Sequence, residues 1–224
     1  MPSTEAPSTS TTTPAPKPLL RGWLHLGTAP LAIIAGLVLT ALGPTLPGRV
    51  SAAVFTLTAV LLFGTSAVYH RGNWSPSTTG VLRRLDHANI FLIIAGTYTP
   101  LAVTLLETRT AIIVLAVVWT GAISGVLARV LWLGAPRWAY VPMYVALGWV
   151  AVGFLSQFYA AGGPVVVWLV GAGGIAYTVG AVVYGTKWPD PSPRYFGFHE
   201  IFHALTVVGF VCHYIAASFA IYRG

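Results

Sequence analysis

Charged side chains are scarce in this sequence of 224 residues. Only 8% of them are Asp, Glu, Lys or Arg, while 56% are hydrophobic, and a soluble domain carries about 25% charged residues. This scarcity excludes an ordinary soluble globular protein and indicates an integral membrane protein. The single cysteine, Cys212, also excludes an internal disulfide.

Acidic residues are the rarest charged class. Five of them stand against 12 basic residues, which gives a formal net charge of +7. The basic residues are spread thinly between apolar runs, so the charge does not indicate nucleic-acid binding. In a membrane protein a basic excess reflects cytoplasmic loops that face anionic lipid.

The chain divides into a tail and a membrane domain. In residues 1–18, 13 of 18 positions are Pro, Thr or Ser, a composition that cannot bury a core, so we expect this tail to be disordered. Residues 19–224 are expected to form the transmembrane domain. No cleavable signal peptide is evident, because the first apolar run is long and further runs follow it.

Long runs without charge predict the spans, each of which needs about 20 residues. The runs are Gly22–Gly48, Val50–His70, Leu85–Leu106, Thr110–Ala128, Trp138–Thr186 and Tyr195–Tyr222. The fifth is too long for one crossing and is divided by Gly162-Gly163-Pro164. The sequence therefore predicts an all-α bundle of seven transmembrane helices.

The basic residues predict the orientation of these seven spans. With the N-terminus inside, nine basic residues fall in inner segments and three in outer segments. The inner ones are Lys17, Arg21, Arg71, Arg83, Arg84, Arg129, Arg137, Lys187 and Arg194. Because basic residues concentrate in cytoplasmic loops, we expect a cytoplasmic N-terminus and a C-terminus outside.

Ionisable residues lie at one level of three predicted spans. His70 ends the second span and Asp86 begins the third. His199 and His203 lie in the first two turns of the last span, so all four are expected near the cytoplasmic face. Ionisable side chains in hydrocarbon cost roughly 2.5–3.5 kcal/mol at mid-helix on insertion scales, so they are rare and usually functional.

This convergence predicts a metal site. Positions four apart share one helix face, so His199 and His203 can chelate one ion, and His70 can complete a three-histidine set. Catalytic zinc sites usually combine three protein ligands with a water, whose pKa falls to about 7. Asp86 could bind that water or take its proton as general base. Ser66, one turn from His70, could orient a ligand or hydrogen-bond a substrate carbonyl.

Each of these residues also has a plainer interpretation. The two histidines of the last span could form an interhelical hydrogen bond. Asp86 could pair with Arg83 or Arg84, or occupy a helix N-terminus, where a carboxylate is favoured. Ser66 could be a packing serine. The coincidence of polar residues on three spans favours the metal site over these alternatives.

The string His199-Glu200-Ile201-Phe202-His203 also matches the zincin signature, in which the glutamate is the general base of a peptidase. No second recognisable protease element follows it, and Glu200 could instead favour the positive N-terminal end of its helix.

The remaining histidines are less clearly placed. His213 lies ten residues beyond His203, roughly 15 Å along a helix axis, so it cannot share the ion and is expected to pack or to form a hydrogen bond. His25 and His87 lie at the right level, and residue spacing does not exclude them as ligands.

Two stretches resemble a known family. Leu85-Asp86-His87-Ala88-Asn89-Ile90-Phe91, followed by Ile94-Ala95-Gly96-Thr97-Tyr98-Thr99-Pro100, resembles the third-helix signature of hemolysin III proteins. Phe198-His199-Glu200-Ile201-Phe202-His203 and the later Cys212-His213-Tyr214 resemble their seventh helix. The resemblance covers roughly residues 20–224 and points to the bacterial branch of the progestin and adipoQ receptor family.

The resemblance implies a seven-helix fold with the N-terminus inside and zinc near the cytoplasmic side. By position, His70, His199 and His203 would be the zinc ligands. Asp86 would be the residue on the zinc-bound water, and Ser66 a partner near the site. His25 resembles a first-helix histidine of the family to which no role is assigned.

The resemblance also implies an activity. The wider superfamily includes alkaline ceramidases, so we expect a zinc-dependent hydrolase of a lipid amide or ester in the bacterial inner membrane. Its partner would be a lipid in the bilayer. The alternatives are a non-catalytic sensor or regulator with structural zinc, and a membrane-permeabilising hemolysin. An open fourth position on the metal would favour catalysis, and a fourth protein ligand would favour structure.

Overall fold

The computed structural model describes residues 18–132, 134 and 136–223. Its regular elements are helices, and these residues form no strand. The elements are α1 (Trp23–Leu42), α2 (Leu46–Arg71), α3 (Pro76–Leu105), α4 (Thr108–Leu131), α5 (Arg137–Gly148), the 3₁₀ helix η1 (Trp149–Phe154), α6 (Leu155–Thr186) and α7 (Phe198–Arg223). The predicted disordered tail, residues 1–18, lies outside the described residues except for Pro18.

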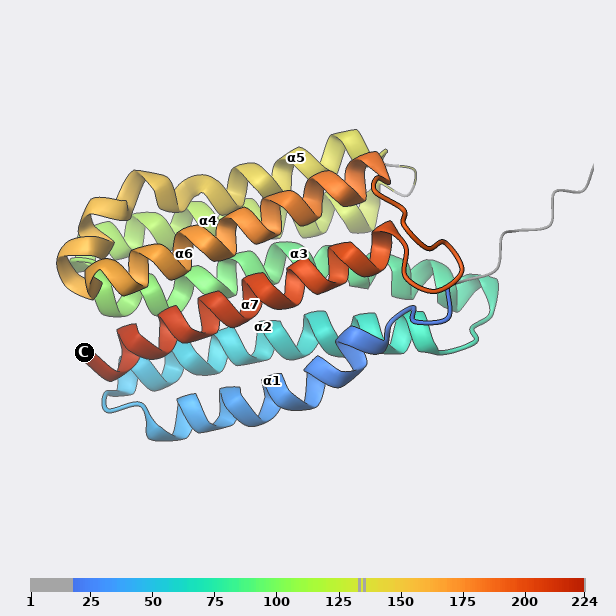
Figure 1. Ribbon diagram of the computed structural model, residues 1–224. Helices are drawn as coiled ribbons and strands as arrows, with labels where there is room; N and C mark the ends of the chain where they lie inside the picture. Colours follow the sequence, from blue (N-terminus) through green and yellow to red (C-terminus); the bar gives the residue numbers. More distant parts are fainter. Residues whose placement is uncertain (1–17, 133, 135, 224) are drawn as a thin grey trace, which may run out of the picture.

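The helices form an up-and-down bundle (Figure 1). Consecutive helices from α1 to α4 are antiparallel neighbours, and so are α6 and α7. The last helix, α7, also contacts α1, α2 and α3, so it joins the two halves of the bundle. The start of α1 and the end of α7 lie at opposite ends of the bundle.

Short polar caps determine where two of the helices begin. Thr45 accepts a hydrogen bond from the Gly48 amide at the start of α2, and Ser75 accepts one from the Thr78 amide at the start of α3, both at 3.2 Å. Each cap is followed by proline in the first turn, where the missing amide hydrogen costs nothing. As a result α3 begins well before the predicted span Leu85–Leu106.

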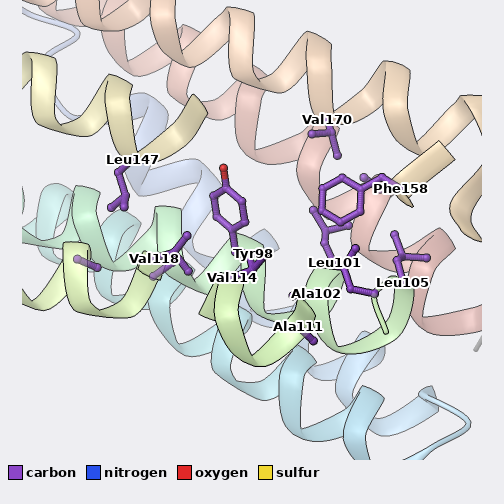
Figure 2. Close-up of a cluster of buried hydrophobic side chains, with 14 of the residues drawn as sticks. Tyr98, Leu101, Ala102, Leu105, Ala111, Val114, Val118, Leu147, Phe158 and Val170 are labelled. Carbon is purple, nitrogen blue, oxygen red and sulfur yellow. The ribbon is translucent and has the colours of Figure 1, made fainter. Parts of the chain in front are cut away.

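The main apolar core lies between α3, α4, α5 and α6. Figure 2 shows its side chains pointing toward one another across these helices, among them Leu101, Val118, Leu147 and Phe158. Tyr98 contributes a polar anchor: its hydroxyl donates to the Gly148 carbonyl at 2.7 Å and accepts from the Ala151 amide at 2.6 Å. These two bonds satisfy backbone groups where α5 gives way to η1.

The outer face of the bundle is apolar. On α1, Leu31, Ile34 and Leu37 are 67%, 61% and 60% exposed. Large exposed apolar patches mark membrane or protein contacts. A lipid environment accounts for this surface, because hydrocarbon tails solvate leucine and isoleucine as well as a protein core does.

Six helical segments of the described chain are long and apolar enough to cross a membrane. Five of them match predicted spans. The other is the 50-residue stretch Arg137–Thr186, where two spans were predicted. The predicted break inside it is present: Gly163 has φ 75° and ψ −179°, so two helices meet there. Glycine tolerates this φ, and Pro164 cannot donate a backbone hydrogen bond across the kink.

Candidate metal centre

The three histidines predicted as ligands come together at one end of the bundle. His70 lies in the last turn of α2, and His199 and His203 lie in the first two turns of α7. One nitrogen from each ring lies within 4.8 Å of the others, and all three side chains are buried. Helix periodicity explains the α7 pair, since residues four apart share a face, and the antiparallel packing of the bundle supplies the third ring.

The donor set fits zinc. His70 Nε2 and His199 Nε2 are 3.2 Å apart. In a tetrahedral site with Zn–N bonds of about 2.0–2.1 Å, the nitrogens lie roughly 3.3–3.4 Å apart, so these two rings already have nearly the required separation. Three imidazoles without a thiolate suit zinc and other borderline divalent metals.

Asp86 lies beside this cluster. Its Oδ2 atom is 3.7 Å from His70 Nε2, and its side chain is buried. The predicted alternatives for Asp86 are not observed. In the described chain the ionisable group within ion-pair distance of Asp86 is His70 rather than an arginine. Helix α3 begins at Pro76, ten residues earlier, so Asp86 is not at a helix N-terminus.

Ser66 lies one turn before His70 on α2 and is buried. Its hydroxyl makes no well-aligned hydrogen bond among the described residues, and its polar neighbour is the Asp86 carboxylate. Ser66 and Asp86 line the same cavity, so a hydroxyl and a carboxylate face one space beside the three histidines. A buried hydroxyl next to a carboxylate fits a polar role at this site better than a packing serine.

The structure favours the plainer interpretation of Glu200 over the zincin one. One carboxylate oxygen pairs with the Arg21 guanidinium, and the other accepts a hydrogen bond from the Gly197 amide at 2.9 Å. Both oxygens are therefore used to tie Arg21 to the start of α7 and to cap that helix. The alternative explanation, a carboxylate favoured at a helix N-terminus, is the one observed.

His25 lies closer to the cluster than the sequence indicated. Its ring stacks on His203 with centroids 3.8 Å apart and meets Phe63 edge-on at 5.1 Å. Its polar neighbour is the backbone of His203, and neither nitrogen makes a well-aligned hydrogen bond in the described chain. Its level was predicted from the span count, but the rotation of α1 that turns it toward His203 was not.

The other two histidines are used elsewhere. His87 has both nitrogens engaged, Nδ1 with the Arg83 carbonyl at 2.6 Å and Nε2 with the Tyr184 hydroxyl at 2.8 Å. Since Nδ1 must donate to the carbonyl, Nε2 accepts the tyrosine proton, and no nitrogen is left for a metal. His213 contacts the Val170 carbonyl through Nε2 at 3.3 Å, so the prediction of a hydrogen-bonded histidine is confirmed.

Two cavities meet at the cluster. The first, of about 330 Å³, has mainly apolar walls and extends from His199, His203 and Ser66 between α3, α5, α6 and α7 as far as Trp149. The second, of about 380 Å³, is more polar and contains His70 and three arginines. The cluster therefore lies between a compartment suited to hydrocarbon and a compartment suited to polar groups.

Comparisons with known proteins agree with the resemblance noted from the motifs. Residues 14–214 match the model of the family described as Haemolysin-III related. The chain is 26% identical over 170 residues to the Hemolysin-3 homolog of Bacillus subtilis (strain 168), covering 76% of each protein. It is 30% identical over 162 residues to Hemolysin-3 of Bacillus cereus, covering 70% of this chain and 74% of the relative. With its six apolar helical segments, the chain is a multi-pass membrane protein that belongs to the haemolysin-III related family.

Proposed function

We propose that this protein is a zinc-dependent hydrolase of a lipid amide or ester. The observation that carries the proposal is a cluster of three buried histidines, two of which line an apolar cavity together with the Asp86 carboxylate and the Ser66 hydroxyl. A cavity with such walls suits an acyl chain, because each buried CH₂ contributes about 0.8 kcal/mol.

His70, His199 and His203 would hold the zinc ion, which supplies Lewis acidity and a water that is nucleophilic at neutral pH. Asp86, whose Oδ2 lies 3.7 Å from His70 Nε2, would accept the proton that the attacking water loses. The Ser66 hydroxyl, whose polar neighbour is Asp86, would donate a hydrogen bond to that carboxylate or to the substrate carbonyl oxygen. The apolar cavity would orient the acyl chain and exclude bulk water from the cleaved bond.

A second candidate is a non-catalytic sensor or regulator in which zinc is structural. The close approach of Asp86 to His70 favours it, since a carboxylate serving as a fourth ligand would close the shell. The hemolysin name belongs to the relatives, and no feature of the described bundle favours a pore.

One experiment with purified protein distinguishes the hydrolase from the sensor. It assays hydrolysis of lipid amides and esters and measures zinc content in parallel. In an enzyme, Asp86→Asn should retain most of the zinc and lose activity by about 10²–10⁴, the usual contribution of a general base. His213→Ala, at a histidine outside the cluster that lines the apolar cavity, is the matched control for zinc content. A zinc-loaded wild type that turns over no lipid in a broad panel would support the sensor.

We also propose seven crossings of the bacterial inner membrane, with the N-terminus in the cytoplasm. A straight helix of 50 residues would extend about 75 Å, against a hydrocarbon thickness of about 30 Å. The break at Gly163 and the opposite directions of α5 and α6 in Figure 1 support two crossings there. Reporters active only in the cytoplasm or only in the periplasm, fused to the N- and C-termini respectively, test this topology, and a cytoplasmic C-terminus would refute it.

A further inference from the structure

The polar cavity beside the cluster carries more positive than negative charge. We call it the basic vestibule and define it by three arginines in its wall: Arg21, Arg83 and Arg137. Among the described residues that line it, Asp86 is the one carboxylate. Glu200, the partner of Arg21, is outside the wall, and neither Arg83 nor Arg137 has an ion pair in the described chain. The vestibule therefore offers cations that its own residues do not neutralise.

Arg137 is held in place rather than extended into solvent. Its guanidinium lies 4.5 Å from the centre of the Tyr184 ring and 5.7 Å from that of Phe198. It also donates to the Tyr184 carbonyl at 3.3 Å through Nη1. A guanidinium fixed in this way loses little freedom when its remaining donors bind an anion, and its planar fork matches phosphate.

The vestibule and the apolar cavity share part of their walls. Asp86, His87, Tyr184 and His199 line both. An amphiphilic molecule with its acyl chain in the apolar cavity would cross this shared wall at its amide or ester linkage. Its headgroup would then enter the vestibule.

We propose that the basic vestibule binds the phosphate-bearing headgroup of an anionic lipid, so that the substrates are acylated phospholipids or lysophospholipids rather than neutral lipids. This assignment of substrate class rests on the proposed lipid hydrolase. It differs from general attraction of basic residues to an anionic bilayer surface, because it requires particular arginines and not their neighbours.

The test measures binding to purified, zinc-loaded protein in uncharged detergent. The two probes carry the same C18:1 ether chain, one as 1-alkyl-glycerol-3-phosphate and the other as 1-alkyl-glycerol, so neither can be hydrolysed. Wild type should bind the phosphate probe at least tenfold more tightly. Arg83→Gln and Arg137→Gln should each lose about tenfold for the phosphate probe and little for the neutral one. Arg84→Gln is the matched control, because Arg84 is adjacent in sequence but lies outside the vestibule wall and donates to the Gly80 carbonyl.

Three results would overturn the proposal: equal affinity for the two probes, an equal loss in Arg84→Gln, or inorganic phosphate binding as tightly as the phosphate probe. Equal affinity would mean that the phosphate is not recognised, an equal loss in Arg84→Gln would leave only general surface charge, and the third result would assign the vestibule to a soluble anion. These outcomes are distinct from a failure of the hydrolase. Turnover of neutral lipids alone would support the hydrolase and reject the headgroup site. Tight binding of the phosphate probe with no turnover of any amide or ester would support the headgroup site and reject the hydrolase.

Discussion

The ion pair between Arg21 and Glu200 ties the segment before α1 to the first turn of α7, and Arg21→Gln breaks it. Glu200 is 1% exposed, and both of its carboxylate oxygens are engaged, one by Arg21 and one by the Gly197 amide. In the variant the buried carboxylate keeps only the backbone donor as a strong partner.

The expected cost follows from this burial. Removing one partner of a buried ion pair destabilises proteins by about 3–5 kcal/mol. The Arg21 side chain retains 19% exposure, so water can replace part of the lost contact, and we expect a loss of about 3 kcal/mol, at the lower end of that range. Because Glu200 lies in the turn that carries His199, zinc affinity should fall as well. In an Arg21→Gln/Glu200→Gln double variant, the loss should be smaller than the sum of the single losses.

Unfolding by SDS in mixed micelles measures the free energy, and competition with a zinc chelator measures the affinity. Arg71→Gln is the matched control, since Arg71 lies at the same end of the bundle and contacts the Trp23 ring at 4.3 Å, a contact that contributes about 0.5–1 kcal/mol at exposed sites. Equal losses in Arg21→Gln and Arg71→Gln, or strictly additive losses in the double variant, would refute the reasoning.

Three further predictions concern the site and its supports. Purified protein should hold about one zinc per chain, measured by elemental analysis. Alanine at His70, His199 or His203 should deplete the zinc, and His213→Ala should not. Equal depletion in His213→Ala would show that the cluster is wrongly assigned. Gly22→Ala should lower zinc affinity by about tenfold, because Gly22 has φ 80° and an added Cβ would lie 2.6 Å from the Cβ of His70. At Gly27 an added Cβ would meet no other described side chain within 4 Å, so Gly27→Ala should leave the chelator titration unchanged. Asn89→Leu should lower the free energy of SDS unfolding by about 0.6–1.7 kcal/mol, because Asn89 donates to the Leu61 carbonyl and to the Thr65 hydroxyl; unchanged stability would contradict that role.

The histidine cluster could be predicted because it needed only helix periodicity and the ends of the apolar runs. His199 and His203 are one turn apart, and His70 and Asp86 lie next to span ends that face the same side. The antiparallel bundle then brings these residues together, as Figure 1 shows for the helices that carry them. The break at Gly163 was predictable for a similar reason, since two glycines and a proline interrupt an otherwise uniform apolar run.

Rotation and depth could not be predicted. A helix surrounded by lipid is apolar all round, so the sequence of α1 does not show which face turns His25 toward His203. The concentration of basic residues in cytoplasmic loops predicts on which side of the membrane a loop lies, but not how deeply a given side chain is buried. Arg129 was assigned to an inner segment but is 6% exposed, with its guanidinium 4.4 Å from the Tyr140 ring centre. The pairing of Arg21 with Glu200 joins residues 179 positions apart, and no local pattern reports it.

The division of the three histidines between α2 and α7 has a consequence for biosynthesis. Chains are synthesised and begin to fold from the N-terminus, so His70 and Asp86 enter the membrane long before α7, the last helix, is made. A complete ligand set exists only after Phe198–Arg223 has inserted and docked against α2. Under the zinc proposal, metal loading would be a late step, and the ratio of zinc to protein in a preparation would report the fraction of molecules that completed assembly.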